Sequence, residues 1–175
     1  MTAQVGVQLA VSTPPGRIAQ AAREVERLGY SELWLAEDFF DLGGVSSVAI
    51  ALAATDHIRV GLGIASVRVR HPALTAMEFA TLEGAFPGRF MAGLGHGVTA
   101  WLEQMGLRPS SPLRSLREGA VAVRRLLDGA ELTVDGEYAS FDAVRLSHRP
   151  DQQVPIYFGV HGPRSLEPAG EVADG

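Results

Sequence analysis

HPALTAMEFATLEGAFPGRFMAGLGHG, residues 71–97, is the stretch that decides the fold of this chain. Its first half predicts a helix, because Pro72 suits the first helical turn and apolar residues then recur at spacings typical of a helix. Pro87-Gly88 ends that helix, and residues 90–94 form an apolar run of the length expected for a strand buried on both faces. The end of the strand carries three alternating glycines: Gly93, Gly95 and Gly97. A flat or phosphorylated ligand can approach a backbone left bare in this way.

The same strand-and-helix pattern repeats along the chain, at about 30 residues per unit. The predicted strands span residues 5–11, 32–36, 58–65, 90–94 and 155–160. The predicted helices span residues 18–28, 45–54, 72–86 and 113–127, with a further helix from 164. Between the fourth helix and the fifth strand, residues 132–134 and 138–146 predict a β-hairpin, because Asp135-Gly136 is a strong two-residue turn signal.

Five strand-and-helix units in series predict a parallel sheet with right-handed crossovers. An open doubly wound sheet and an eight-stranded barrel compete as closures, and the first strand is not followed by the G-x-G-x-x-G of a dinucleotide-binding open sheet. Chemically capable residues gather instead at the carboxyl ends of strands: Gln8, Glu37, Asp38, Ser66, His96 and His161. This distribution favours a (β/α)8 TIM-type barrel. Because five strands do not close a barrel, residues 1–175 are predicted to form a single domain, the truncated N-terminal portion of one.

Composition excludes several classes of function. A net charge of −5 argues against a nucleic-acid-binding surface, and no apolar run reaches the length of a membrane span. The chain has no cysteine, which rules out a thiolate metal site and a cysteine nucleophile, and no lysine for Schiff-base chemistry. No histidine–carboxylate spacing resembles a metal site, so none is predicted. The N-terminus lacks a secretory signal, which favours a cytoplasmic protein.

Seven segments along the chain carry a resemblance to one family: VGVQLA, LWLAEDFF, IRVGLGIAS, RHPALTAMEFATLE, PGRFMAGLGHG, VDGEY and PIYFGVHGPRSLEPAGEVADG. Together they resemble the luciferase-like monooxygenase superfamily, and within it the coenzyme F420-dependent branch that includes methylenetetrahydromethanopterin reductase. The resemblance implies a barrel whose chain continues through three more units, with a sixth strand beginning at EVADG. It also implies hydride transfer between coenzyme F420, or FMN as the alternative, and a small organic substrate.

The resemblance further implies which residues bind the coenzyme. The third strand would carry a non-proline cis peptide bond between Gly63 and Ile64, bulging against the deazaflavin ring. The loop 95–97 would lie beside the ring, and backbone amides of the loop 159–163 would hold the coenzyme tail. The full set is Gly63, Ile64, Ala65, Ser66, Gly95, His96, Gly97, Gly159, Val160, His161, Gly162 and Pro163. Ordinary strand ends and strand-to-helix turns are the alternative interpretation of these segments.

Three residues are candidates for catalysis: Gln8, Glu37 and Asp38. Asp38 occupies the position where the F420 branch has a histidine near the reacting carbon. A carboxylate in a partly dry pocket can exchange protons near neutrality, whereas an aspartate at a strand end can also simply cap a helix. Gln8 replaces a glutamate that is important in the methylenetetrahydromethanopterin reductases. Because glutamine cannot ionise, this departure argues for a hydride partner other than the pterin.

Two other functions stay open at this point. In the first, the chain lacks half of a barrel and is an inactive folding or binding module. Its unpaired strand edges would then pair with a second copy, giving a homo-oligomer, or with the missing half of the barrel. The glycine loops alone would also suit an unrelated barrel enzyme acting on phosphorylated substrates. Among other residues, Trp101 and Met105 are candidates for a pocket wall, and His71 for a helix cap.

Overall fold

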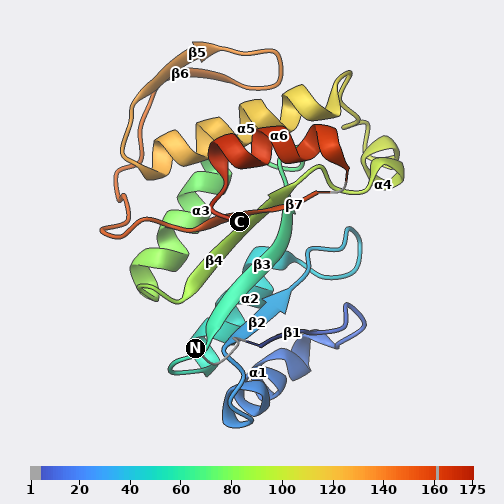
Figure 1. The fold of residues 1–175 in the computed structure, drawn as a ribbon, viewed down its shortest axis with the longest axis vertical. Helices are drawn as coiled ribbons and strands as arrows, with labels where there is room; N and C mark the ends of the chain where they lie inside the picture. The colour runs from blue at the N-terminus through green and yellow to red at the C-terminus, as the bar shows by residue number, and fades with distance from the viewer. Residues whose placement is uncertain (1–4, 161) are drawn as a thin grey trace.

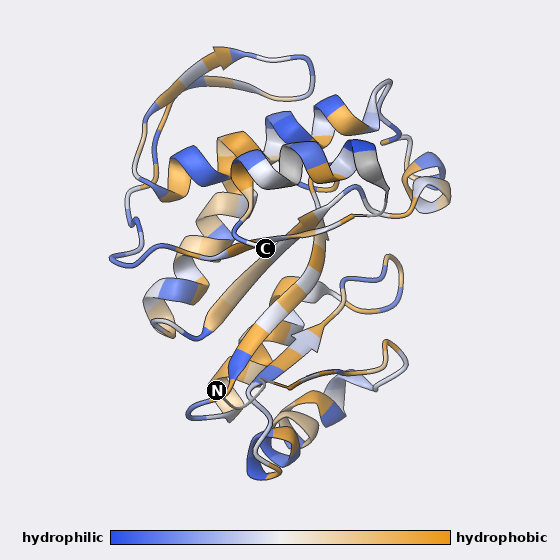
Figure 2. Cartoon of the chain, viewed as in Figure 1, coloured by the Kyte–Doolittle hydropathy of each residue, from blue (hydrophilic) through white to orange (hydrophobic). Residues whose placement is uncertain are grey.

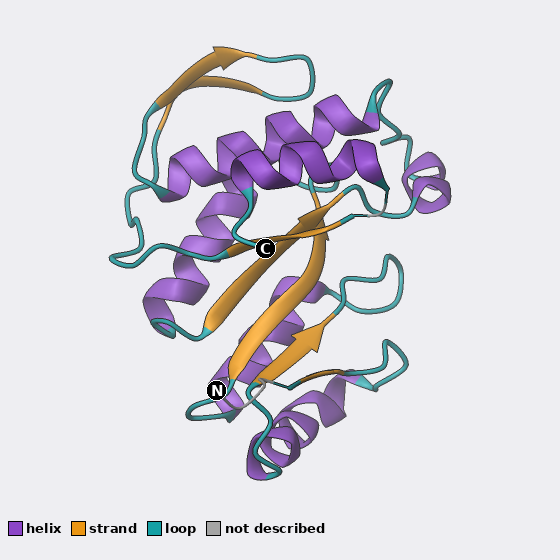
Figure 3. Cartoon of the chain, viewed as in Figure 1, coloured by secondary structure: helices purple, strands orange, loops and turns teal. Residues whose placement is uncertain are grey.

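The structure is a computed structural model that describes residues 5–160 and 162–175. Five parallel strands form one sheet in the order β1-β2-β3-β4-β7 (Figure 1). These strands are β1 (Gly6–Gln8), β2 (Glu32–Leu35), β3 (Arg59–Ser66), β4 (Phe90–Gly95) and β7 (Ile156–Gly159). A two-stranded antiparallel hairpin stands apart from the sheet (Figure 3) and consists of β5 (Leu132–Asp135) and β6 (Ser140–Val144).

The helices follow their strands in chain order. They are the 3-10 helix η1 (Pro15–Arg17), α1 (Ile18–Arg27), α2 (Gly44–Ala54), α3 (Pro72–Ala85), α4 (Thr99–Gln104), α5 (Pro112–Leu127) and α6 (Pro163–Val172). The sequence missed α4, because six residues are too few to show a helical period. His71 caps α3 as predicted, its Nδ1 accepting a hydrogen bond from the Ala73 N–H at 3.2 Å. No helix in the described part of the chain is long and apolar enough to cross a membrane.

The core lies between the sheet and the helices. Along the sheet, Leu33, Val60 and Phe90 pair in one register row, and Leu35, Leu62 and Ala92 pair in the next row on the same face, two residues further on. All six side chains are buried with apolar residues of α1, α2, α3 and α5. α5 carries alternating hydrophobic and hydrophilic patches along its length (Figure 2), as expected for a helix with one buried face.

The opposite side of the sheet carries glycines where the helix-covered side carries large residues. We call it the glycine face and define it by Gly61, Gly63, Gly93, Gly95 and Gly159. Trp34 lies on this face: a Cβ added to Gly61 would come within 2.3 Å of the indole ring. Its Nε1–H donates to Glu32 at 3.1 Å, and its ring meets Tyr157 edge-on at 5.5 Å. The glycines therefore let aromatic rings lie directly against the strands.

The predicted two-residue turn of the hairpin is wrong. Asp135 pairs with Ser140, so the loop between the strands comprises the four residues 136–139. The Glu118 carboxylate on α5 accepts hydrogen bonds from the backbone N–H groups of residues 137, 138 and 139, at 3.2, 2.8 and 2.8 Å. A contact from a distant helix thus sets the loop, and the local Asp135-Gly136 signal does not.

The outer edge of β7 is partly paired. The Asp174 N–H donates to the Ile156 carbonyl at 2.7 Å, and the Phe158 N–H donates to the Gly175 carbonyl at 2.9 Å. Residues 171 and 172 belong to α6, and residues 173–175 form no strand, so a sixth strand that starts within EVADG stays a prediction. At the other edge, β1 is shorter than predicted, ending at Gln8 rather than at residue 11.

Candidate functional site

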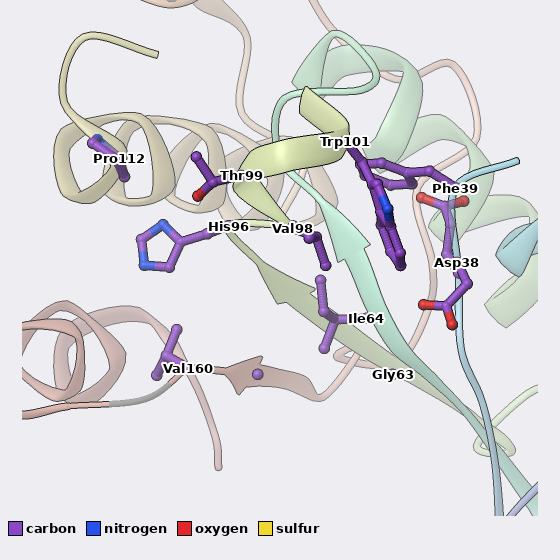
Figure 4. A pocket seen from close by; sticks show the side chains of 13 residues that line it. Asp38, Phe39, Gly63, Ile64, His96, Val98, Thr99, Trp101, Pro112 and Val160 are labelled. Carbon is purple, nitrogen blue, oxygen red and sulfur yellow. The ribbon is translucent and has the colours of Figure 1, made fainter. Parts of the chain in front are cut away.

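A cavity of about 440 Å³ opens at the carboxyl ends of β2, β3, β4 and β7 (Figure 4). Side chains at the ends of parallel strands converge at one edge of a sheet, which is where such folds place their sites. The lining residues are Glu37, Asp38, Phe39, Gly63, Ile64, His96, Gly97, Val98, Thr99, Trp101, Pro112, Gly159 and Val160. The structure therefore brings together predicted residues from four strand ends.

Ile64 lies centrally in this cavity, between the His96 side and the Asp38 side (Figure 4). The Gly63–Ile64 peptide bond is cis, as predicted, and the pairing of β3 with β4 shifts register there. Ile64 packs against the bare backbone of two neighbouring strands: a Cβ added to Gly95 or Gly159 would come within 2.9 or 2.5 Å of its side chain. The glycines thus make room for Ile64, which forms an apolar platform facing the cavity.

The residues that line the cavity do not include Ala65, Ser66 or Gly95. Ser66 is only 1% exposed, and its Oγ donates to the carbonyl oxygen of His96 at 2.9 Å. Gly97 follows with φ of +77°, and a Cβ there would come within 2.7 Å of the Ser66 Oγ. Ser66 therefore positions the loop 95–97 and is not itself a wall of the site.

His96 lines the cavity, half-buried, with its Nε2 3.4 Å from the Oγ of Ser165 on α6. Burial lowers the pKa of His96 below its ordinary value of 6.5, although a backbone hydrogen bond at Pro112 partly opposes this. The imidazole is therefore neutral at pH 7.

The lowered pKa of His96 predicts a pH dependence of stability. Because the unfolded histidine binds a proton at higher pH than the folded one, the free energy of unfolding should fall as the pH drops below 6.5. Urea unfolding between pH 7.5 and 5 measures this, and His96→Gln should flatten the curve in that window. His148→Gln, at an exposed position, controls for the removal of a histidine. An unchanged curve in His96→Gln would contradict the prediction.

Glu37 and Asp38 follow β2 but differ in their surroundings. The Glu37 carboxylate, with a side chain only 5% exposed, accepts two hydrogen bonds from the Arg70 guanidinium, at 2.9 and 2.5 Å. Glu78 on α3 approaches the Arg70 Nε at 3.3 Å, and burial raises the pKa of Glu78. Among the described residues no side chain pairs with the Asp38 carboxylate. Asp38 is therefore the free acid of the cavity, and Glu37 is held by an ion pair.

The chain after Asp38 forms a tight turn that carries two aromatic rings. The Asp38 carbonyl accepts from the N–H groups of Asp41 and Leu42, both at 3.1 Å. Phe40 has φ of +70°, a conformation that is costly for a residue with a bulky side chain. The turn places Phe39 against Trp101 of α4, with ring centroids 5.6 Å apart.

Sequence reasoning missed several lining residues, namely Phe39, Val98, Thr99 and Pro112. They lie in loops or at the start of a helix, where no periodicity marks them. Trp101, a candidate for a pocket wall, does line the cavity, and Met105 is not among the lining residues. Besides Trp101, the aromatic pair Phe39-Phe40 beside two acids was a signal available for this wall.

Other predicted residues lie elsewhere. Gln8 is exposed at the end of the edge strand β1, paired with Trp34, and does not line the cavity. Gly162 has φ of +90° and precedes Pro163, the first residue of α6; His161 lies outside the described residues. Within residues 5–160 and 162–175, no group of three or more histidine, aspartate or glutamate side chains gathers as a metal site.

Comparison with known proteins gives relatives with related activities. The chain is 32% identical over 170 residues to 5,10-methylenetetrahydromethanopterin reductase of Methanolobus tindarius, covering 97% of this chain and 52% of that protein. It is 35% identical over 127 residues to an F420-dependent glucose-6-phosphate dehydrogenase of Microbacterium testaceum, covering 70% of this chain and 38% of that protein.

Among solved structures, an F420-dependent secondary alcohol dehydrogenase in complex with an F420-acetone adduct superposes with a TM-score of 0.89 at 25% identity. The match covers 99% of this chain and 57% of the other. The chain thus spans about half the length of the proteins that it matches. The family model for luciferase-like monooxygenases matches residues 1–175, and the chain belongs to that family.

Proposed function

We propose that this chain forms the coenzyme-binding part of an F420-dependent oxidoreductase that transfers hydride between the coenzyme and a small organic substrate. The observation that carries the proposal is the cavity at the carboxyl ends of four strands, with Ile64 seated as an apolar platform over the glycine face. Two of the relatives described above are F420-dependent enzymes with different substrates, which supports a shared coenzyme and leaves the substrate open.

The residues present fit a flat tricyclic coenzyme. Ile64 offers an apolar surface for one face of a ring, and Gly97 leaves the neighbouring loop without a side chain. Val160 and the start of α6 lie on the side of the cavity away from Asp38 (Figure 4). Unpaired backbone N–H groups at a helix start suit the anionic tail of such a coenzyme. The predicted coenzyme residues Gly63, Ile64, His96, Gly97, Gly159 and Val160 therefore share one cavity.

We infer that the five-stranded sheet corresponds to the first five strands of an eight-stranded barrel. The strands are all parallel and neighbour one another in chain order, as barrel strands do, and the matched relatives are about twice as long. The glycine face would then be the barrel interior. Pairing with a second copy or with the rest of a barrel stays a prediction, which size-exclusion chromatography of the chain can test.

The coenzyme, when bound, supplies the hydride chemistry, and the chain supplies orientation and proton handling. Asp38 carries the unpaired carboxylate and is our candidate for exchanging a proton with substrate. Glu37 is held by Arg70, so its part is to fix the strand end from which Asp38 projects. Phe39 and Trp101 exclude water from the same side of the cavity.

Coenzyme titration tests the proposal. We expect the chain to bind F420 with a dissociation constant well below about 1 mM, and FMN more weakly, as measured by calorimetry. Ile64→Ala removes the apolar platform and should weaken F420 binding by between about tenfold and about sixtyfold, because three methyl or methylene groups are lost and each contributes up to about 0.8 kcal/mol when the coenzyme covers it.

The matched control is Ile50→Ala, the same change at a residue of α2 that is 40% exposed. It should leave the F420 dissociation constant unchanged. Binding of neither F420 nor FMN below about 1 mM would refute the proposal. An equal loss in both variants would instead show that the platform has no part in binding.

A further inference from the structure

We propose that the tip of the β5–β6 hairpin is a positioning element of the coenzyme site, with Tyr138 as its positioning residue. We define the hairpin tip as residues 136–139, the loop between the two strands. None of these four residues lines the cavity. The inference rests on the proposed function and deepens it, because the hairpin tip holds in place Pro112 and His96, which do line the cavity.

The hairpin lies beside α5 (Figure 1), and its tip is bound there at two places. Glu118, in the second turn of α5, accepts hydrogen bonds from three backbone N–H groups of the hairpin tip, as described above. The Tyr138 hydroxyl oxygen accepts a hydrogen bond from the Ser111 N–H at 2.9 Å and lies 2.7 Å from the Oγ of Ser110. Tyr138 is therefore held against both the body of α5 and the residues that precede it.

One route from Tyr138 to the cavity runs through the start of α5. Ser111 is the N-cap residue of α5, and Pro112 is its first residue. The Ser111 side chain makes no capping hydrogen bond, so the helix start lacks the local bond that commonly fixes it. The Tyr138 hydroxyl supplies a bond from outside the helix and holds the backbone one residue before Pro112. The Pro112 backbone in turn makes the hydrogen bond that raises the pKa of His96 against the effect of burial.

A second route runs through Arg68, which follows β3. The Arg68 Cζ lies 5.3 Å from the centre of the Tyr138 ring, and its Nη1 donates to the Tyr138 carbonyl at 3.4 Å. The Arg68 N–H donates to the Ser66 Oγ at 3.2 Å, and that Oγ donates to the His96 carbonyl. The Tyr138 ring is thus joined to the loop 95–97 through one arginine and one serine.

The two routes meet in a closely packed region. Arg68, His96 and Pro112 all border one small space of only about 20 Å³. Protein interiors packed to this density have low compressibility, so a displacement on one side is passed to the other. A change at Tyr138 should therefore move the cavity wall at Pro112 and His96, although Tyr138 does not touch the cavity itself.

Tyr138→Phe tests this inference, because it removes only the hydroxyl and keeps the ring that faces Arg68. We expect it to weaken F420 binding by about threefold to tenfold, the range that corresponds to the loss of one hydrogen bond, as measured by calorimetry. In the coenzyme-free chain, the pKa of His96 should fall, because the Pro112 bond that raises it is loosened. The imidazole NMR resonances of His96, assigned with His96→Gln, measure this pKa, and a loss of stability alone would not change it.

The matched control is Tyr30→Phe, the same change in the turn between α1 and β2, at a residue that is 37% exposed. It should change neither the F420 dissociation constant nor the pKa of His96. A Tyr138→Phe protein that keeps either value of the unmodified chain overturns the inference, and so do equal changes in Tyr30→Phe. Failure of the proposed function is seen separately, because the unmodified chain would not bind F420, whereas the coenzyme-free titration of His96 would still test its link to the hairpin tip.

Discussion

Gly93→Ala is expected to destabilise the chain by about 3 kcal/mol or more, among the largest losses that a single methyl group can cause. A Cβ at this position would lie 2.0 Å from the carbonyl oxygen of Leu62 and 3.1 Å from the Cγ2 of Ile64. The first of these neighbours is backbone in the adjacent strand, so it cannot move without separating β3 from β4. Urea unfolding followed by circular dichroism measures the loss.

Gly84→Ala provides the matched control, since the chemical change is the same. Gly84 lies exposed near the end of α3, and a Cβ there would meet nothing within 4 Å. Alanine should therefore stabilise the helix by up to about 1 kcal/mol. The two variants are expected to shift the urea midpoint in opposite directions, and a Gly93→Ala protein as stable as the unmodified chain would show that the sheet relaxes around the methyl group.

Arg70→Met is expected to cost about 3–5 kcal/mol of stability, because it leaves the buried Glu37 carboxylate without its counter-ion. Glu78 would lose the same cation, so two carboxylates would then share one partly buried site. The double variant Glu37→Leu/Arg70→Met should be more stable than Arg70→Met, because no uncompensated buried charge remains. Urea unfolding at pH 7.5 measures the free energy of unfolding of the unmodified chain, of Arg70→Met and of the double variant.

The control for Arg70→Met is Arg27→Met, which breaks the exposed pair between Arg27 and Glu24 on α1. An ion pair at the surface contributes little, so this change should cost less than about 1 kcal/mol. If Arg70→Met and Arg27→Met cost the same, the Glu37 ion pair has no special role. If the double variant is no more stable than Arg70→Met, the charge argument is wrong.

The order of strands and helices could be predicted from the sequence because each element carries its own period and its own end signals. Residues 71–97 do so most fully: α3 and β4 lie within one residue of their predicted ends. The predictions failed where a distant residue determines local structure. Glu118 reshapes a hairpin loop about twenty positions further on, and no local turn preference could reveal that.

The outline of the candidate site could also be predicted, because most of its residues lie at or just after the ends of strands. Strand ends locate Asp38, Ile64 and His96 at one edge, and the family resemblance supplied the Gly63–Ile64 bond. The ion pair that separates Glu37 from Asp38 joins residues 33 positions apart, and only the folded chain brings them together. Sequence alone could not distinguish a buried, paired carboxylate from a free one beside it.

Ile64 and the glycines beneath it have a consequence for how this family can evolve. A methyl group at Gly95 or Gly159 would collide with the Ile64 side chain, within 2.9 or 2.5 Å. A smaller residue at position 64 removes that collision at Gly159, where the nearest atoms belong to Ile64 alone. We therefore expect a larger residue at position 159 to arise only in descendant lineages that already carry a smaller residue at position 64.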